Sequence, residues 1–134
     1  VIGVLPEGLA RREIAHAGLA ELHVVDSMHA RKTMMADSSN AFVALPGGLG
    51  TLEEVFEVWT WSQLGIHAKP VGFLDVEGYF EGLFDFLDGS VAEGFVSAAH
   101  RGLALREEDP DRLLARLADA DVSAMEDGLG REAR

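Results

Sequence analysis

The stretch Pro46-Gly47-Gly48-Leu49-Gly50-Thr51-Leu52-Glu53-Glu54 directly follows the apolar run Ala41-Phe42-Val43-Ala44-Leu45. An apolar run, a glycine-rich turn and an amphipathic segment in this order predict a strand, a turn and a helix. Glycines let the backbone approach an anion, and the N–H groups at the start of a helix point toward it. The stretch therefore favours a phosphate-binding turn, although a tight strand-to-helix connection without a ligand explains the glycines equally well.

A second cluster, Met28-His29-Ala30-Arg31-Lys32, lies upstream and carries two adjacent cations. A cation near the start of a helix opposes the macrodipole, at a cost on the order of 0.3–1 kcal/mol. This cost indicates a role for Arg31 and Lys32 with an anionic ligand, but a solvated helix face is the commoner explanation for such a pair.

The composition of the chain limits the classes of function. It has 134 residues, a formal net charge of −12 and no cysteine. The negative charge disfavours nonspecific binding to nucleic acid and to anionic membranes, because both require a basic surface. The lack of cysteine excludes disulfides, thiol catalysis and cysteine metal sites, and favours a cytoplasmic location. No apolar run approaches the roughly 18–20 residues that cross a bilayer.

Short apolar runs alternate with helix-length segments along residues 1–118, which we expect to form one domain. Strands are predicted at 1–5, 22–26, 41–46, 70–74 and 102–105. Helices are predicted at about 9–17, 28–39, 51–64, 79–93 and 110–118. The pattern predicts an α/β fold with a parallel sheet flanked by helices. Residues 119–134 are polar and acidic, and we expect a disordered tail.

The predicted site residues follow the ends of predicted strands. In open α/β sheets, ligands bind at the carboxyl ends of the strands. The strand at 41–46 ends in the glycine turn, the strand at 22–26 leads to Met28, and the strand at 1–5 leads toward Arg12 and Glu13. The shared position of these segments favours one binding site.

Glu54 has two interpretations. Thr51 followed three residues later by Glu54 matches a capping box, in which Thr51 is the N-cap and each side chain satisfies a backbone N–H. The same carboxylate suits catalysis. The histidines and acidic residues show no spacing typical of metal ligands.

The two motifs, Met28 to Lys32 and Pro46 to Glu54, together resemble the paired signatures of the LOG family, and the similarity extends from residue 1 to about 117. The resemblance implies a Rossmann-like α/β fold that forms a homodimer. It also implies a phosphoribohydrolase of cytokinin biosynthesis that needs no cofactor or metal. Its substrate would be a small nucleotide, AMP or an N6-prenylated adenosine monophosphate, and its products the free base and ribose 5-phosphate.

The resemblance also implies roles for individual residues. The catalytic pair maps to Arg31 and Glu54. A carboxylate stabilises an oxocarbenium-like transition state and activates water, and Arg31 would hold Glu54 ionised. The substrate-binding positions map to Glu13, Met28, Lys32, Gly47, Gly48, Leu49, Gly50, Thr51, Leu52 and Glu53.

The chain departs from the family pattern at its start. Family members begin with two further βα units, including a glycine-rich strand end that lines the nucleotide site. We therefore expect an N-terminally truncated LOG-type enzyme. The alternatives are a nucleotide-binding module without hydrolysis and an inactive fragment. The label lysine decarboxylase, often given to the family, finds little support, because Lys32 and Lys69 are the only lysines and neither has the context of a Schiff-base lysine.

Overall fold

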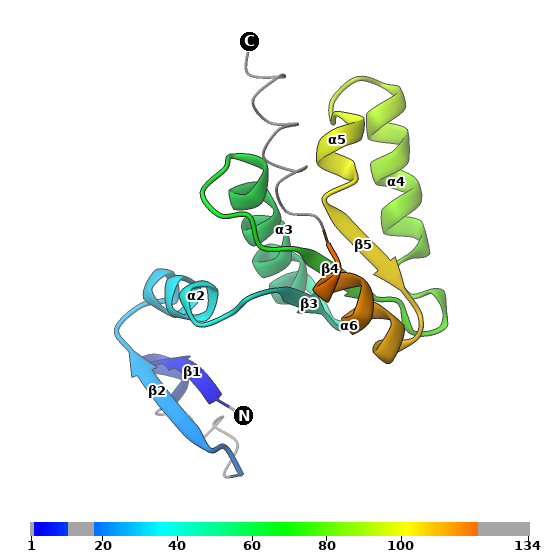
Figure 1. Cartoon of the computed structure of the whole chain (residues 1–134). Helices are drawn as coiled ribbons and strands as arrows, with labels where there is room; N and C mark the ends of the chain where they lie inside the picture. Colours follow the sequence, from blue (N-terminus) through cyan, green and yellow to red (C-terminus); the bar gives the residue numbers. More distant parts are fainter. Residues whose placement is uncertain (1, 11–17, 121–134) are drawn as a thin grey trace. The chain divides into compact units, whose positions relative to one another are not determined.

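The computed structural model describes residues 2–10 and 18–120, and these form parallel strands connected by helices (Figure 1). The chain divides into two compact units, Val1–Ser39 and Asn40–Arg134, and each is described by itself. The α/β fold with parallel strands flanked by helices is confirmed. The expected single domain over 1–118 stays a prediction, and the expected tail lies, from residue 121 on, outside the described residues.

The first unit is built on two parallel strands. Its elements are β1 (Ile2–Pro6), α1 (Glu7–Ala10), β2 (Glu21–Val25) and α2 (Met28–Asp37). Most of the helix expected over 9–17 lies outside the described residues. Because β1 and β2 run in the same direction, α1 and α2 both start at the carboxyl edge of this sheet.

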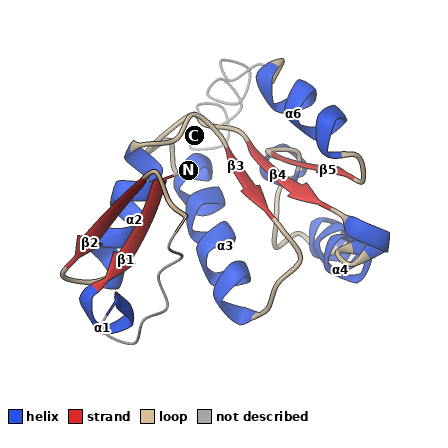
Figure 2. Cartoon of the chain, turned by 90° about the horizontal axis from the view of Figure 1, so that it is seen from below, coloured by secondary structure: helices blue, strands red, loops and turns tan. Residues whose placement is uncertain are grey.

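The second unit is a three-stranded parallel sheet in the order β3-β4-β5, with helices on both faces. Figure 2 shows α6 on one face and α3 and α4 on the other. The elements are β3 (Phe42–Ala44), α3 (Leu49–Gln63), β4 (Val71–Leu74), the 3-10 turn η1 (Val76–Gly78), α4 (Glu81–Ala92), α5 (Ala98–Arg101), β5 (Ala104–Glu107) and α6 (Pro110–Ala118).

Adjacent residues of the central strand β4 pack against helices on opposite faces of the sheet, because successive side chains of a strand point to opposite sides. Phe73 is fully buried, and its ring meets Phe84 at 5.0 Å and Trp59 at 6.0 Å between centroids, which joins the sheet to α4 and α3. Gly72 faces α6, where an added Cβ would lie 2.8 Å from Leu113 Cδ1. The missing side chain at Gly72 thus lets α6 pack close to the sheet.

The helix predicted at 79–93 is confirmed as α4, which begins two residues later, at Glu81, and ends at Ala92. The 3-10 turn η1 that precedes it was not predicted, and in this turn Glu77 and Gly78 adopt φ of 52° and 73°. Tyr79 lies between η1 and α4 and is 56% exposed. The short helix α5 was not predicted.

The last helix begins where the sequence predicts. Asp109 is its N-cap, the Asp109 carboxylate accepts a hydrogen bond of 2.8 Å from the N–H of Arg112, and Pro110 is the first helical residue. This arrangement satisfies one of the helix's unpaired donors and uses the fixed φ of proline.

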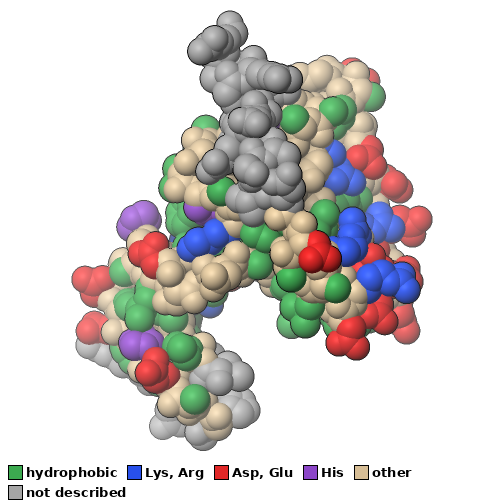
Figure 3. All heavy atoms as spheres, viewed as in Figure 1, with side chains coloured by type: hydrophobic (Ala, Val, Ile, Leu, Met, Phe, Trp, Pro, Cys, Tyr) green, Lys and Arg blue, Asp and Glu red, His purple; other side chains and the backbone are tan. Residues whose placement is uncertain are grey.

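The arginines of the described part of the second unit lie in ion pairs. Figure 3 shows positive and negative side chains interleaved over α4, β5 and α6. The pairs, from 2.8 to 3.3 Å, are Arg101–Asp88, Arg106–Asp75, Arg112–Glu107 and Arg116–Glu107. These cations therefore stabilise the packing of the last helices around β5. None of the helices in the described part of the chain combines the length and hydropathy that crossing a bilayer requires.

Candidate active site at the start of helix α3

The glycine turn connects β3 to α3, and the helix begins two residues earlier than predicted, at Leu49. Gly48 is the N-cap and provides no side-chain hydrogen bond. The first bond within the helix runs from the N–H of Leu52 to the carbonyl of Gly48, at 3.1 Å. The helix therefore offers no acceptor to the N–H groups of Gly48, Leu49, Gly50 and Thr51.

The capping box predicted from Thr51 and Glu54 is wrong. Because α3 begins at Leu49, Thr51 is the third helical residue, whereas a capping box requires it at the N-cap. Glu54 is the sixth helical residue and lies beyond the first turn. Capping therefore does not explain the carboxylate of Glu54, and its catalytic role stays a prediction.

The start of α3 is open to solvent. Gly48, Leu49 and Gly50 are exposed, and Leu49 is 86% exposed, which is unusual for a leucine. The aligned peptide dipoles place a partial positive charge of about half an elementary charge at this end of the helix. N–H donors without a partner inside the helix and a positive helix end are the features that favour binding of an anion such as phosphate.

Gly47 lies in the most crowded part of the turn. A Cβ at Gly47 would collide with Thr51 Oγ1 and would lie 2.9 Å from Thr51 Cβ. The Tyr79 hydroxyl donates a 2.6 Å hydrogen bond to the Gly47 carbonyl. The backbone of the turn is therefore held from two sides, by Thr51 from within the helix and by Tyr79 from the segment after β4.

Two carboxylates follow the turn on α3. Glu54 is three residues after Thr51 and four after Gly50, so these three residues share one face of the helix. At a rise of about 1.5 Å per residue, Glu54 lies roughly 4.5 Å along the helix axis from Thr51 and roughly 9 Å from Gly48. Glu54 is half-buried and Glu53 is exposed, while Leu52 packs against the hydrophobic core.

The remaining predicted site residues belong to the first unit. Met28, Arg31 and Lys32 lie on α2, directly after the carboxyl end of β2. Arg31 is half-buried, and its Nε donates a 3.0 Å hydrogen bond to the Val4 carbonyl in β1. Glu13 lies outside the described residues. The expected pairing of Arg31 with Glu54 stays a prediction.

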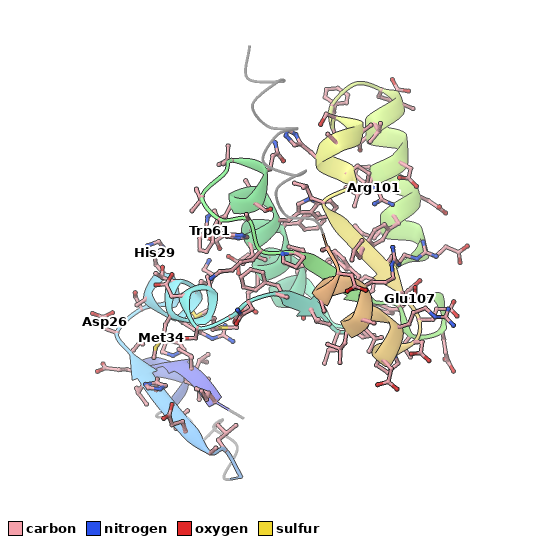
Figure 4. All side chains as sticks on the ribbon, in the orientation of Figure 1. Asp26, His29, Met34, Trp61, Arg101 and Glu107 are labelled. Carbon is pink, nitrogen blue, oxygen red and sulfur yellow. The ribbon has the colours of Figure 1, made fainter. Side chains whose placement is uncertain are left out.

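The histidines with described positions have local roles. His29 is exposed in the first turn of α2 (Figure 4). His67 packs against the Phe42 ring, its Nδ1 accepts a hydrogen bond from the Lys69 N–H at 3.1 Å, and burial lowers the pKa of its ring. Within residues 2–10 and 18–120, no cluster of three or more histidines and carboxylates suits a metal ion.

Sequence reasoning missed Tyr79, whose hydroxyl bonds to the turn, and Asp75, which accepts a hydrogen bond from the Phe80 N–H. Asp75 directly follows β4 and is completely buried, with its carboxylate 2.8 Å from Arg106 Nε. The rule that ligand sites lie after the carboxyl ends of strands, applied to the predicted strand at 70–74, would have found Asp75. Tyr79 had no comparable signal, because its partner is a backbone carbonyl far away in the sequence.

We expect Gly47→Ala to destabilise the second unit by about 1–3 kcal/mol, because the new methyl group forces the turn away from the stiff Thr51 side chain. Gly50→Ala is the matched control. Nothing lies within 4 Å of a Cβ at Gly50, and alanine in a helix is favoured by about 0.5–1 kcal/mol over glycine. Urea denaturation of the two variants measures both effects. Equal stability of the Gly47→Ala variant and the original chain would contradict the crowding of this turn.

Comparison with known proteins identifies the family of the chain. A family model described as possible lysine decarboxylase matches residues 1–117. The chain is 51% identical over 119 residues to the probable cytokinin riboside 5′-monophosphate phosphoribohydrolase LOGL9 of Oryza sativa subsp. japonica, covering 89% of this chain and 52% of the relative. It is 50% identical over 119 residues to the cytokinin riboside 5′-monophosphate phosphoribohydrolase LOG1 of Arabidopsis thaliana, covering 89% of this chain and 56% of the relative.

The chain spans about half the length of the curated relatives it matches. The matched region contains both motifs and every described element of the two units up to α6. From the family match over residues 1–117 and the identity of about half of the aligned residues, the chain belongs to the LOG family, whose model carries the description possible lysine decarboxylase.

Proposed function

We propose that this chain hydrolyses the N-glycosidic bond of adenosine 5′-monophosphates, including N6-modified ones, and releases the free base and ribose 5-phosphate. The observation that carries the proposal is the uncapped start of α3, with a half-buried carboxylate one turn further on the same face. The names of the relatives, which specify a riboside 5′-monophosphate, agree with a site that combines an anion cradle and a carboxylate.

The turn binds the 5′-phosphate in this proposal. The donors of Gly48, Leu49, Gly50 and Thr51 have no acceptor inside the helix, so an anion gains their hydrogen bonds without breaking others. Exposed glycines leave room for the phosphate oxygens to approach the backbone. The site works by local charge and backbone dipoles, and it therefore suits a chain with a net charge of −12.

Glu54 performs the chemistry. Its carboxylate stabilises positive charge that develops on the ribose as the bond to the base lengthens, and it accepts a proton from the attacking water. The resulting hydroxide adds to C1′, the electron pair of the broken bond stays on the base nitrogen, and the proton that Glu54 accepted passes to the base, which returns Glu54 to its ionised form. A phosphate at the helix start directs the attached ribose along the face that carries Glu54.

The family resemblance adds residues of α2 and one residue before β2 to the proposed site. Arg31 and Lys32 supply positive charge to the nucleotide, Arg31 as a guanidinium with fixed donors, and Met28 and Glu13 contact the substrate. The hydrogen bond from Arg31 to the Val4 carbonyl supports a positioning of this side chain by the first sheet.

Decarboxylation with pyridoxal phosphate fits the described geometry less well. That chemistry requires a lysine that forms a Schiff base with the cofactor. Lys69 stands just before β4, at the amino edge of the second sheet, whereas the glycine turn lies at the carboxyl edge. Because the strands are parallel, the two positions are at opposite edges, and Lys69 does not serve a cofactor bound at the turn.

We expect Glu54→Gln to reduce base release by at least about 100-fold, because the amide cannot accept the proton and carries no negative charge. Chromatographic detection of free base from AMP and N6-isopentenyl-AMP measures the effect. Glu57→Gln is the matched control: it removes the same charge from the same helix about one turn further on, and we expect near-normal release.

The outcome separates the proposal from its alternative. Unchanged release by a folded Glu54→Gln variant would exclude Glu54 as the catalytic carboxylate. Binding of AMP without base release by the original chain would favour a nucleotide-binding module and would overturn the hydrolase.

A homodimer is also part of the proposal. The end of α3 presents two exposed apolar side chains, Leu64 and Ile66, 66% and 65% exposed, and such surfaces favour association. Trp59, in the same helix, is buried and donates a 2.9 Å hydrogen bond to the His100 carbonyl, so it serves the core of its own unit.

We expect sedimentation equilibrium to show a dimer that Ile66→Asp dissociates, since a buried carboxylate at the interface lacks a partner. Phe95→Asp is the control, because Phe95 is equally apolar and 88% exposed but follows α4. A monomeric original chain, or loss of the dimer only in the Phe95 variant, would refute this interface.

A further inference from the structure

The Tyr79 hydroxyl makes an unusual contact for a side chain that is mostly exposed. Tyr79 is 56% exposed, yet its hydroxyl donates a 2.6 Å hydrogen bond to the Gly47 carbonyl, 32 residues away in the sequence. An exposed hydroxyl has water available, so nothing about solvation requires this bond. The contact joins the segment after β4 to the glycine turn after β3.

The bond acts on one particular peptide plane. The Gly47 carbonyl and the Gly48 N–H belong to the same planar peptide unit, in which the two groups point in opposite directions. A hydrogen bond that holds the carbonyl toward Tyr79 therefore directs the Gly48 N–H away from Tyr79. Gly48 is the N-cap of α3, so Tyr79 orients the first of the four donors at the helix start.

The segment that carries Tyr79 is held by the buried Asp75, which pairs with the half-buried Arg106. Asp75 is completely buried, and one carboxylate oxygen accepts a 2.7 Å hydrogen bond from the Phe80 N–H. The other oxygen lies 2.8 Å from Arg106 Nε on β5. This closes a loop from Asp75 to Phe80, and the Tyr79 ring packs edge-on against Phe80 at 5.0 Å between centroids.

The backbone of this loop adopts a costly conformation. Glu77 has φ of 52°, in the left-handed region that residues with a side chain rarely adopt, and Gly78 follows with φ of 73°. The N–H of Tyr79 then bonds to the Val76 carbonyl at 3.0 Å. The two residues with positive φ reverse the direction of the chain just before Tyr79, two residues ahead of the start of α4. Strain of this kind persists where the surrounding structure enforces it.

From these contacts we propose that Tyr79 is a positioning residue of the phosphate-binding turn, and that the ion pair of Asp75 with Arg106 holds Tyr79 in place. Tyr79 acts through the Gly47 carbonyl and touches neither the base nor the reacting C1′. The proposal rests on the proposed function, because it assigns Tyr79 to the binding of the same 5′-phosphate. It identifies a second strand end, after β4, as a support of the site.

The variant Tyr79→Phe removes the hydroxyl and keeps the ring against Phe80. We expect the Kd for AMP, measured by calorimetry on the whole chain, to rise about three- to tenfold, the effect of losing one hydrogen bond. The Kd for adenosine, which has no phosphate, is expected to stay unchanged, and the loss of one hydrogen bond is expected to lower the midpoint of thermal unfolding only slightly. A purely structural role would weaken the binding of both ligands together.

Amide hydrogen exchange without ligand provides a second readout. We expect faster exchange in Tyr79→Phe across residues 45–52, and unchanged exchange in the control Phe86→Leu, which alters another exposed aromatic side chain on α4. Unchanged AMP affinity together with unchanged exchange would overturn the role of Tyr79.

The outcomes for Tyr79 and for the hydrolase are distinguishable. Base release by the original chain with no effect of Tyr79→Phe on AMP binding would overturn only the role of Tyr79. A selective loss of AMP affinity in Tyr79→Phe without base release by the original chain would support Tyr79 and overturn the hydrolase. Equal affinity of the original chain for AMP and adenosine would overturn both, because the turn would then bind no phosphate.

Discussion

The second unit depends on a helix that begins with no side chain to cap it. The N-cap of α3 is Gly48, and the helix provides no acceptor for the first four N–H groups. Unpaired donors at a helix start are normally satisfied by a side chain, by water or by a ligand. Here the N-cap is a glycine, so no side chain accepts a hydrogen bond from these N–H groups, and they stay accessible. A glycine N-cap costs only roughly a few tenths of a kcal/mol relative to a capping side chain, and it leaves these donors accessible to an anion.

The rest of the second unit holds this helix start in place. Phe73 at the centre of the sheet contacts Trp59 of α3 and Phe84 of α4, and the Trp59 indole bonds to the His100 carbonyl. On the opposite face, Gly72 lets α6 approach. Because aromatic rings pack with defined geometry, this cluster fixes the direction of α3 relative to β3 and β4. A rigid scaffold of this kind is what a site of backbone donors requires, since backbone groups cannot change rotamer to meet a ligand.

Much of the fold was predictable from local pattern. Apolar runs between helix-length segments located the five strands, and the predicted start of the last helix at residue 110 is confirmed, because capping by Asp109 is a local interaction. The start of α3 was misplaced for a physical reason: Thr51 and Glu54 have the spacing of a capping box, whereas a glycine N-cap leaves no side-chain signal. The turn before α4 was missed because the left-handed φ of Glu77 is imposed by its surroundings.

The positions of the glycine turn and of Glu54 in the fold could be predicted from the sequence, whereas the long-range contacts of the turn could not. The glycine turn and Glu54 stand together on β3 and α3, as the order of the motif predicts. The contacts that hold them are long-range: Tyr79 bonds to Gly47, and Asp75 pairs with Arg106. Arg31 is similar, because the Val4 carbonyl that accepts its hydrogen bond lies 27 residues away and compensates part of the unfavourable helix dipole. No local pattern identifies such partners.

The central claim is that the backbone at the start of α3 binds a 5′-phosphate. The most direct measurement is NMR of the ¹⁵N-labelled chain during titration with AMP and, separately, with adenosine. The account predicts saturable shifts of the Gly48, Leu49, Gly50 and Thr51 amide signals with AMP and much smaller shifts with adenosine. Equal shifts with both ligands, or AMP shifts that leave these four amides unchanged, would contradict it.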